Sequence, residues 1–158
     1  MPKRKLPKII LSNGKEIDLE ILMVGMEDNT DLIHWFLNIG TGEVESYSED
    51  YPSLEQFERD MERIENDDNI KPIPKPEPWE AYEFMKNFNE EVAKQNNGLL
   101  YEKLLIALDG KGAFRRFKDV LHDDREMLER WYQYKEEQLV KEVRGWLESL
   151  GVDFKEKN

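Results

Sequence analysis

The side chains that most enzymes use for covalent or metal chemistry are scarce in this chain of 158 residues. It contains no cysteine and two histidines, His34 and His122. Thiolate nucleophiles, disulfides, thiolate metal sites and multi-histidine metal centres are therefore excluded. No serine, aspartate or second histidine accompanies His34 in a catalytic pattern, so we expect a partly exposed strand residue there. We predict no catalytic residue, no metal and no cofactor.

Common phosphate-binding patterns are absent as well. The sequence has no Walker-type loop, no dinucleotide-binding glycine pattern and no nucleophile elbow. The aspartate-rich runs at 27–31 and 66–69 lack the spacing of a calcium-binding loop. Carboxylates are so frequent that no single pair of them indicates acid–base catalysis. These absences favour a non-enzymatic protein over an enzyme.

One basic cluster contrasts with the acidic composition of the chain. It lies at the start of a predicted helix and consists of Lys111, Arg115, Arg116 and Lys118. Ion pairing with carboxylates such as Glu90, Glu91 or Asp119 is the simpler interpretation. The alternative is an anion site, because two adjacent arginines beside the N-terminal end of a helix beginning at Gly112 suit a phosphate or carboxylate. A small hydrolase or a nucleotide-binding protein would use such a site.

The net charge of the chain is −12, and the negative charge is concentrated between residues 27 and 68. That stretch holds 14 Asp and Glu but two Arg. Four of the glutamates fall on the outer face of a predicted helix: Glu55, Glu58, Glu62 and Glu65. Such a face repels phosphates, so direct DNA or RNA binding through this half is unfavourable. We interpret it as a solubilising surface, as a docking surface for a basic protein partner, or as a mimic of a phosphate backbone.

Two hairpins are predicted in the first part of the chain. Residues 7–19 contain Asn13-Gly14, a favoured two-residue hairpin turn. The second hairpin pairs residues 33–39, in which apolar residues alternate, with residues 44–47 across a glycine-rich turn.

The segment between the hairpins, residues 17–27, is compatible with a strand. Its apolar spacing nevertheless favours a short helix that begins near Asp18.

The acidic helix and a proline-rich segment come next. Ser53 starts a capping-box pattern ahead of an amphipathic helix that ends at residues 66–69. Residues 70–78 contain four prolines at alternate positions, so they are extended and cannot be helical. We interpret this segment as a connector, and Ile70 and Ile73 would also allow it to lie along a sheet edge.

Four helices are predicted in the second half. They span residues 78–94, 99–108, 112–121 and 124–149, with Pro78 starting the first and Asp123 capping the last. Gly145 within the last helix indicates close helix packing or a bend. Four aromatic residues lie on apolar faces and are expected in the core: Phe114, Phe117, Trp131 and Trp146.

Three segments carry a family resemblance: IGTGEV at 39–44, GKGAFRRFKDVL at 110–121 and ERWYQYKEEQLVKEVRGWLESLGV at 129–152. Their order and spacing resemble uncharacterised protein family 0158, with a TGEV-type hairpin before a helical half. The family's later motifs correspond to Ala113–Asp119, Trp131-Tyr132 and Trp146-Leu147. The resemblance covers about residues 30–152; the longer N-terminal hairpin and the acidic 54–68 helix depart from it. It implies a shared fold and little chemistry, because no activity is established for the family.

These patterns predict an α+β fold, with a small antiparallel sheet in the N-terminal half followed by a helical half of four helices. We expect a single domain over residues 1–158, with a β-rich part at 7–73, the connector at 70–78 and a helical part at 79–150. No apolar run is long enough to span a membrane and the start lacks a signal-peptide apolar region, so we expect a cytoplasmic protein. The expected function is binding or regulation through charged surfaces.

Overall fold

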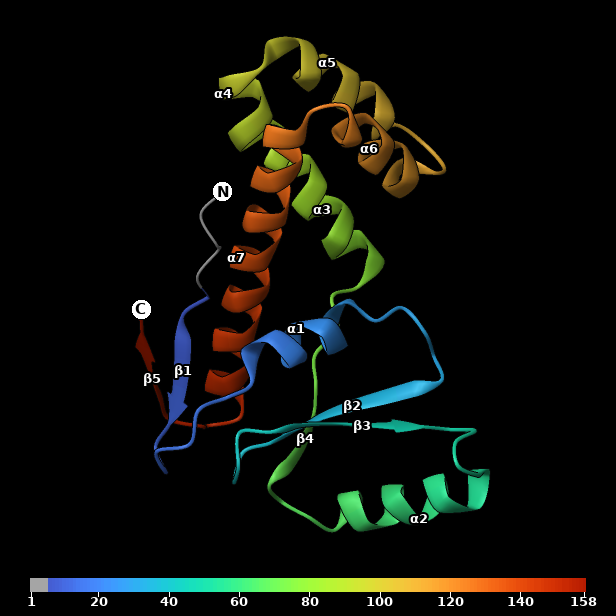
Figure 1. Cartoon of the computed structure of the whole chain (residues 1–158), viewed down its shortest axis with the longest axis vertical. Coiled ribbons are helices and arrows are strands. Elements are labelled where there is room, and N and C mark those ends of the chain that lie inside the picture. Colours follow the sequence, from blue (N-terminus) through green and yellow to red (C-terminus); the bar gives the residue numbers. More distant parts are fainter. Residues whose placement is uncertain (1–5) are drawn as a thin grey trace. The chain divides into compact units, whose positions relative to one another are not determined.

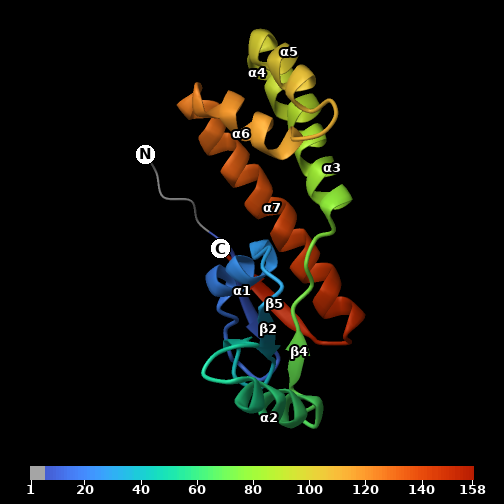
Figure 2. The same ribbon diagram turned by 90° about the vertical axis from the view of Figure 1, so that its right-hand side faces the viewer.

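The structure is a computed structural model that describes residues 6–158. The chain divides into two compact units, one formed by residues 1–75 and 142–158 and the other by residues 76–141 (Figure 1). The boundary at residue 75 falls inside the proline-rich connector, which is extended between β4 (Ile70–Pro72) and α3 (Pro78–Phe88) in both views (Figure 2). The longest helix, α7 (Arg125–Ser149), contributes residues to both units.

A three-stranded antiparallel sheet lies in the first unit. Its central strand is β2 (Ile33–Asn38), which pairs with β3 (Val44–Ser48) on one side and with β4 on the other. The hairpin predicted at 33–47 is therefore confirmed, and the proline-rich segment does begin along a sheet edge. A Cβ at Gly42 would lie 2.1 Å from the Glu16 carbonyl oxygen, and its φ is +80°, so this turn requires glycine.

The hairpin predicted at 7–19 forms as a short hairpin, and β1 (Lys8–Leu11) also has a second strand partner that was not predicted. The chain turns at Asn13-Gly14, and β1 meets the return segment in a bridge between Ile10 and Glu16. The Leu11 N–H donates to the Lys15 carbonyl at 2.8 Å, and the Ile17 N–H donates to the Ile9 carbonyl at 2.9 Å. The second partner of β1 is β5 (Phe154–Lys157), from the far end of the chain. The first unit consequently contains two small antiparallel sheets where one was expected. Local turn chemistry predicts the bend at Asn13-Gly14, but it carries no information about a strand that is distant in sequence.

The ambiguous segment at 17–27 is helical. Helix α1 (Leu19–Glu27) begins after Asp18, whose side chain accepts a hydrogen bond from the Ile21 N–H at 3.3 Å. Gly25 lies against the Trp35 ring so closely that a Cβ there would be 2.9 Å from it. The helix therefore packs directly on β2.

Helix α2 (Leu54–Glu65) packs on the same sheet. Its cap is Ser53, whose side chain accepts a hydrogen bond from the Gln56 N–H at 3.1 Å, as the sequence predicted. On its inner side, Ile64 forms a small buried cluster with Phe36 of β2 and Ile70 of β4. The opposite side of α2 faces solvent.

The second unit is helical. A continuous helical run consists of α3, a π-helical turn η1 (Asn89–Ala93) and α4 (Lys94–Asn96); α5 (Gly98–Ala107) and α6 (Ala113–His122) follow before α7. Counting that first run once, the four predicted helices are present, although the π turn was not predicted. Within residues 6–158, no helix combines the length and apolarity needed to cross a bilayer.

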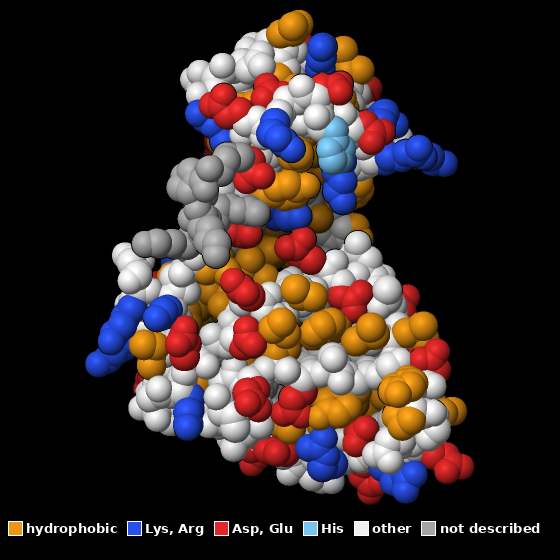
Figure 3. Space-filling view, viewed as in Figure 1, with side chains coloured by type: hydrophobic (Ala, Val, Ile, Leu, Met, Phe, Trp, Pro, Cys, Tyr) orange, Lys and Arg blue, Asp and Glu red, His pale blue; other side chains and the backbone are white. Residues whose placement is uncertain are grey.

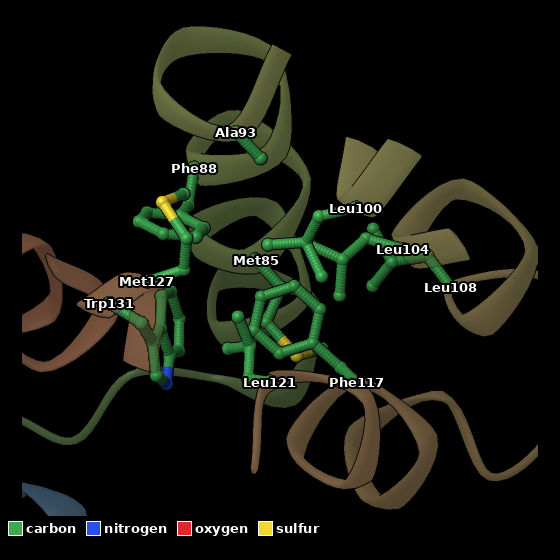
Figure 4. Packing of buried hydrophobic residues seen from close by; sticks show 10 residues of the cluster. All are labelled: Met85, Phe88, Ala93, Leu100, Leu104, Leu108, Phe117, Leu121, Met127 and Trp131. Atoms are coloured by element: carbon green, nitrogen blue, oxygen red, sulfur yellow. The ribbon is translucent and has the colours of Figure 1, made fainter. Parts of the chain in front are cut away.

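The core of the second unit is built around three aromatic rings (Figure 4). Phe117 and Phe88 are fully buried and meet Trp131 edge to face, with ring centroids 5.0 and 5.4 Å from the indole. The predicted burial of Phe117 and Trp131 is thus confirmed. Phe114 is 43% exposed, so its assignment to the core is wrong, and Trp146 is half-buried.

The buried face of α6 explains the error at Phe114. It consists of Ala113, Phe117 and Leu121, a four-residue spacing that rotates Phe114 away from the core.

Two expectations about α7 also differ from the structure. The Met127 N–H donates to the side chain of Asp124, at 3.1 Å, so the cap lies one residue beyond the predicted Asp123. At Gly145 no atom outside the neighbouring backbone of its own helix lies within 4 Å of the place a Cβ would take, and the helix continues through it. The close packing expected there is absent among the described residues.

We expect Phe117→Ala to destabilise the second unit by about 3–5 kcal/mol, because it removes a buried ring between Phe88 and Trp131. Phe114→Ala is the matched control on the same helix and should cost less than about 1 kcal/mol. Urea unfolding followed by far-UV circular dichroism measures both. Equal destabilisation by the two substitutions would contradict this description of the core.

Candidate functional site

The outer side of α2 presents the four glutamates that the sequence singled out. Their side chains are all exposed: Glu55, Glu58, Glu62 and Glu65. We call this surface the acidic face of α2. Figure 3 shows acidic side chains over much of the first unit on the side in view, interspersed with hydrophobic ones.

The two arginines of α2 do not neutralise the acidic face. Arg59 donates from Nε to the backbone carbonyl of Glu55 at 3.4 Å. Arg63 donates to the Tyr47 hydroxyl at 2.9 Å and lies 5.8 Å from the centre of that ring. Within residues 6–158, none of the four glutamates forms an ion pair. The four glutamates of the face are therefore exposed and have no ion-pair partner in that part of the chain.

The contact between Arg63 and Tyr47 ties α2 to β3. Burial, together with a hydrogen bond from its hydroxyl to Glu45, raises the pKa of Tyr47. The hydrogen bond to Tyr47 in turn raises the pKa of Arg63. The phenol is therefore neutral and the guanidinium charged throughout the physiological range, and this contact holds Arg63 away from the acidic face.

An open groove of about 400 Å³ lies at the C-terminal end of α2, between this helix and β4. The buried residues of its lining are all apolar: Phe36, Ile64 and Ile70. The more open residues of its lining are Met61, Pro72, Glu65, Asp67, Asp68 and Lys71. Glu65 belongs both to this groove and to the acidic face of α2. The two surfaces are therefore continuous.

The basic cluster on α6 is divided between different partners. Arg115 is 90% exposed and pairs with Asp119 at 3.9 Å, in agreement with the ion-pair interpretation. Arg116 donates to the backbone carbonyls of Ala107 (3.1 Å), Asp109, Gly110 (3.5 Å) and Lys111. It thereby satisfies carbonyl groups at the end of α5 and in the loop that follows it, while Lys111 and Lys118 are exposed.

The other carboxylates considered for this cluster have partners within the second unit. Glu90 accepts a hydrogen bond from Tyr101 at 2.9 Å and pairs with Lys94. Glu91 accepts one from Tyr134 at 3.3 Å, and burial, with Glu91 next in importance, raises the pKa of Tyr134 to about 12. Neither carboxylate is an ion-pair partner of the α6 arginines in the part of the chain that the structure describes.

His34 is a half-exposed residue of strand β2, as expected. Its Nε2 lies 2.9 Å from the Glu49 carboxylate, and its ring lies 5.0 Å from that of Phe57 on α2. Ser48, on the paired strand, donates to Asp50 at 2.6 Å and not to the imidazole. Across the described residues, no group of three or more His, Asp and Glu side chains is arranged to hold a metal ion.

A second open depression, of about 430 Å³, lies between α3 and α5 and was not predicted. Asn89, at the π turn, contributes to its lining and is fully buried. Its amide nitrogen donates to the Tyr101 carbonyl at 3.3 Å, whereas its Oδ1 has no partner within the described residues. That oxygen has no accessible surface, so a molecule in the depression would not reach it.

We expect Arg116→Ala to destabilise the second unit by about 1–3 kcal/mol, since it leaves several backbone carbonyls without a donor. Arg115→Ala should change stability by no more than about 0.5 kcal/mol, because its ion pair is exposed. Thermal and urea unfolding of both variants test the assignment. If Arg115→Ala proved the more damaging of the two, the structural role assigned to Arg116 would be wrong.

Comparison with known proteins identifies the family and no individual relative. Searches of curated proteins and of solved structures found no match to the chain. One family model matches residues 13–158, a longer stretch than the 30–152 indicated by the sequence motifs. The chain therefore belongs to the uncharacterised protein family UPF0158.

Proposed function

We propose that this chain is a non-enzymatic, cytoplasmic binding module that recognises a cationic protein partner through the acidic face of α2. The observation that carries the proposal is the set of four exposed glutamates on one side of one helix, none with an ion-pair partner among the described residues. Both arginines of the helix are directed to other groups.

Carboxylates one helical turn apart repel one another, so their proximity slightly destabilises the free protein. A partner that brings lysine or arginine side chains relieves this repulsion, and the long-range attraction also accelerates encounter. The contact between Ile64 and the sheet fixes the orientation of the helix, so the charges are presented in a defined direction. These properties support recognition of a partner through the negative charge of the four glutamates and through their arrangement along the helix.

Neither alternative function is favoured by a comparable observation. An anion site on α6 would need both arginines, yet Arg116 donates to four backbone carbonyls. Phosphate groups of nucleic acid would meet an uncompensated negative surface on α2.

Replacing Glu55, Glu58, Glu62 and Glu65 together with Gln should weaken partner binding about tenfold, because four rim charges contribute a few tenths of a kcal/mol each. The four side chains are exposed, so the fold should be retained. Affinity capture from native lysate, quantified by mass spectrometry at low and high salt, measures the effect. Capture by the parent protein should fall as salt rises, since salt screens charges beyond about 10 Å at 0.1 M.

The matched control removes four exposed carboxylates of the first unit that lie outside α2: Glu16, Glu20 and Glu43 replaced by Gln, and Asp31 by Asn. It changes the net charge by the same amount and should retain the captured partner. Equal loss of capture in both variants would mean that binding depends on net charge alone. Capture that survives the α2 replacements would show that the acidic face is not the binding surface.

A further inference from the structure

We propose that the groove between α2 and β4 is the anchor site for an arginine side chain of the cationic partner. This inference rests on the proposed function and adds the identity of the residue that docks. It is carried by the combination of an apolar floor and an acidic rim in one open groove, which continues into the acidic face of α2.

The floor of the groove is suited to an aliphatic stem. Ile64 and Ile70 are each 6% exposed and form the base together with Phe36, while Met61 packs against this cluster and is only partly covered. The three methylene groups of an arginine cover apolar surface of this kind while the charged end stays in water.

The rim of the groove is negatively charged. Glu65 and Asp68 are exposed, and neither forms an ion pair within residues 6–158. Asp67 differs from them because its Oδ1 accepts the Asn69 N–H at 2.9 Å and so holds the turn after α2. Lys71 also lines the groove, so its lining carries three carboxylates, two of them without a hydrogen-bond or ion-pair partner among the described residues, and one cationic side chain.

Arginine fits this combination better than lysine or leucine. The guanidinium group is planar, offers five donors and is less strongly hydrated than an ammonium group, so it can contact both carboxylates at the edge of an apolar surface. A leucine would fill the floor but would leave the two carboxylates without a partner. A lysine would supply the same charge, but its ammonium group is a compact point charge without the planar arrangement of donors that contacts both carboxylates.

The probe is a fluorescent helical peptide with lysines one turn apart and a single arginine at one end. Three otherwise identical peptides carry lysine, citrulline or leucine at that position. Lysine keeps the charge, citrulline keeps the shape, and leucine keeps only the apolar bulk. Fluorescence anisotropy at low salt measures the dissociation constant of each peptide for the full-length protein.

The arginine peptide should bind about tenfold more tightly than the citrulline peptide, the effect of one charge-assisted contact, and measurably more tightly than the lysine peptide. In the double variant Glu65→Gln/Asp68→Asn, the preference for arginine should fall to less than about twofold, which is the coupling that a double-mutant cycle isolates. The control Glu16→Gln/Asp31→Asn, with the same charge change outside the groove, should keep the full preference.

The outcomes separate this inference from the proposed function. If all four peptides bind equally, if the leucine peptide binds best, or if the groove variant keeps the arginine preference, the anchor assignment is overturned. With any of these three results, the proposed function would still hold if peptide binding is lost when Glu55, Glu58 and Glu62 are replaced by Gln. If Glu55, Glu58 and Glu62 can be replaced by Gln without loss of any peptide, the proposed function fails and this inference fails with it.

Discussion

The contact of Ile64 with Phe36 and Ile70 determines what the first unit presents to solvent. Helix α2 has its apolar residues on one side, and this small cluster is where that side is held against the sheet. Once the inner side is fixed, the 3.6-residue period of the helix places the glutamates on the opposite side. The acidic face is thus a consequence of packing, and its direction is as well defined as the packing itself.

The same contact explains the groove. The cluster contains three buried residues, which is too few to fill the whole space between α2 and β4, so part of Met61 remains open to solvent. Strand β4 covers only residues 70–72 of this sheet edge, and three further prolines follow it in the connector. An apolar floor beside an acidic rim is the result.

Much of this unit could be predicted from local sequence patterns. The Ser53 cap, the helix after it, the hairpin at 33–47 and the extended start of the proline-rich segment each depend on patterns of a few residues, and each was confirmed. The position of the acidic face followed from the helical period. The groove could not be predicted, because its lining comes from three separate segments at 36, 61–68 and 70–72 that only the tertiary fold brings together.

The features that the sequence patterns missed or assigned wrongly share one cause, which is that they depend on contacts between distant parts of the chain. The partner of β1 is a strand more than a hundred residues away whose sequence, FKEK, carries one apolar residue. Phe114 lies beside the buried face of α6, and only the position of the neighbouring helices decides which aromatic residue turns inward. The sequence predicts that Arg116 is a solvent-facing charge, yet the bend between α5 and α6 brings backbone carbonyls within reach of its guanidinium group. Long-range geometry decides each of these cases, and local pattern does not.

The central claim is that recognition takes place on α2 and its groove. The most direct measurement is a ¹H–¹⁵N correlation spectrum of the full-length protein recorded during titration with the arginine peptide. We predict that the perturbed amide signals belong to residues 54–72, with the largest shifts near Glu65 and Asp68, and that they diminish with added salt. Shifts concentrated instead in residues 111–118, or spread evenly over the exposed acidic residues of the chain, would contradict the account.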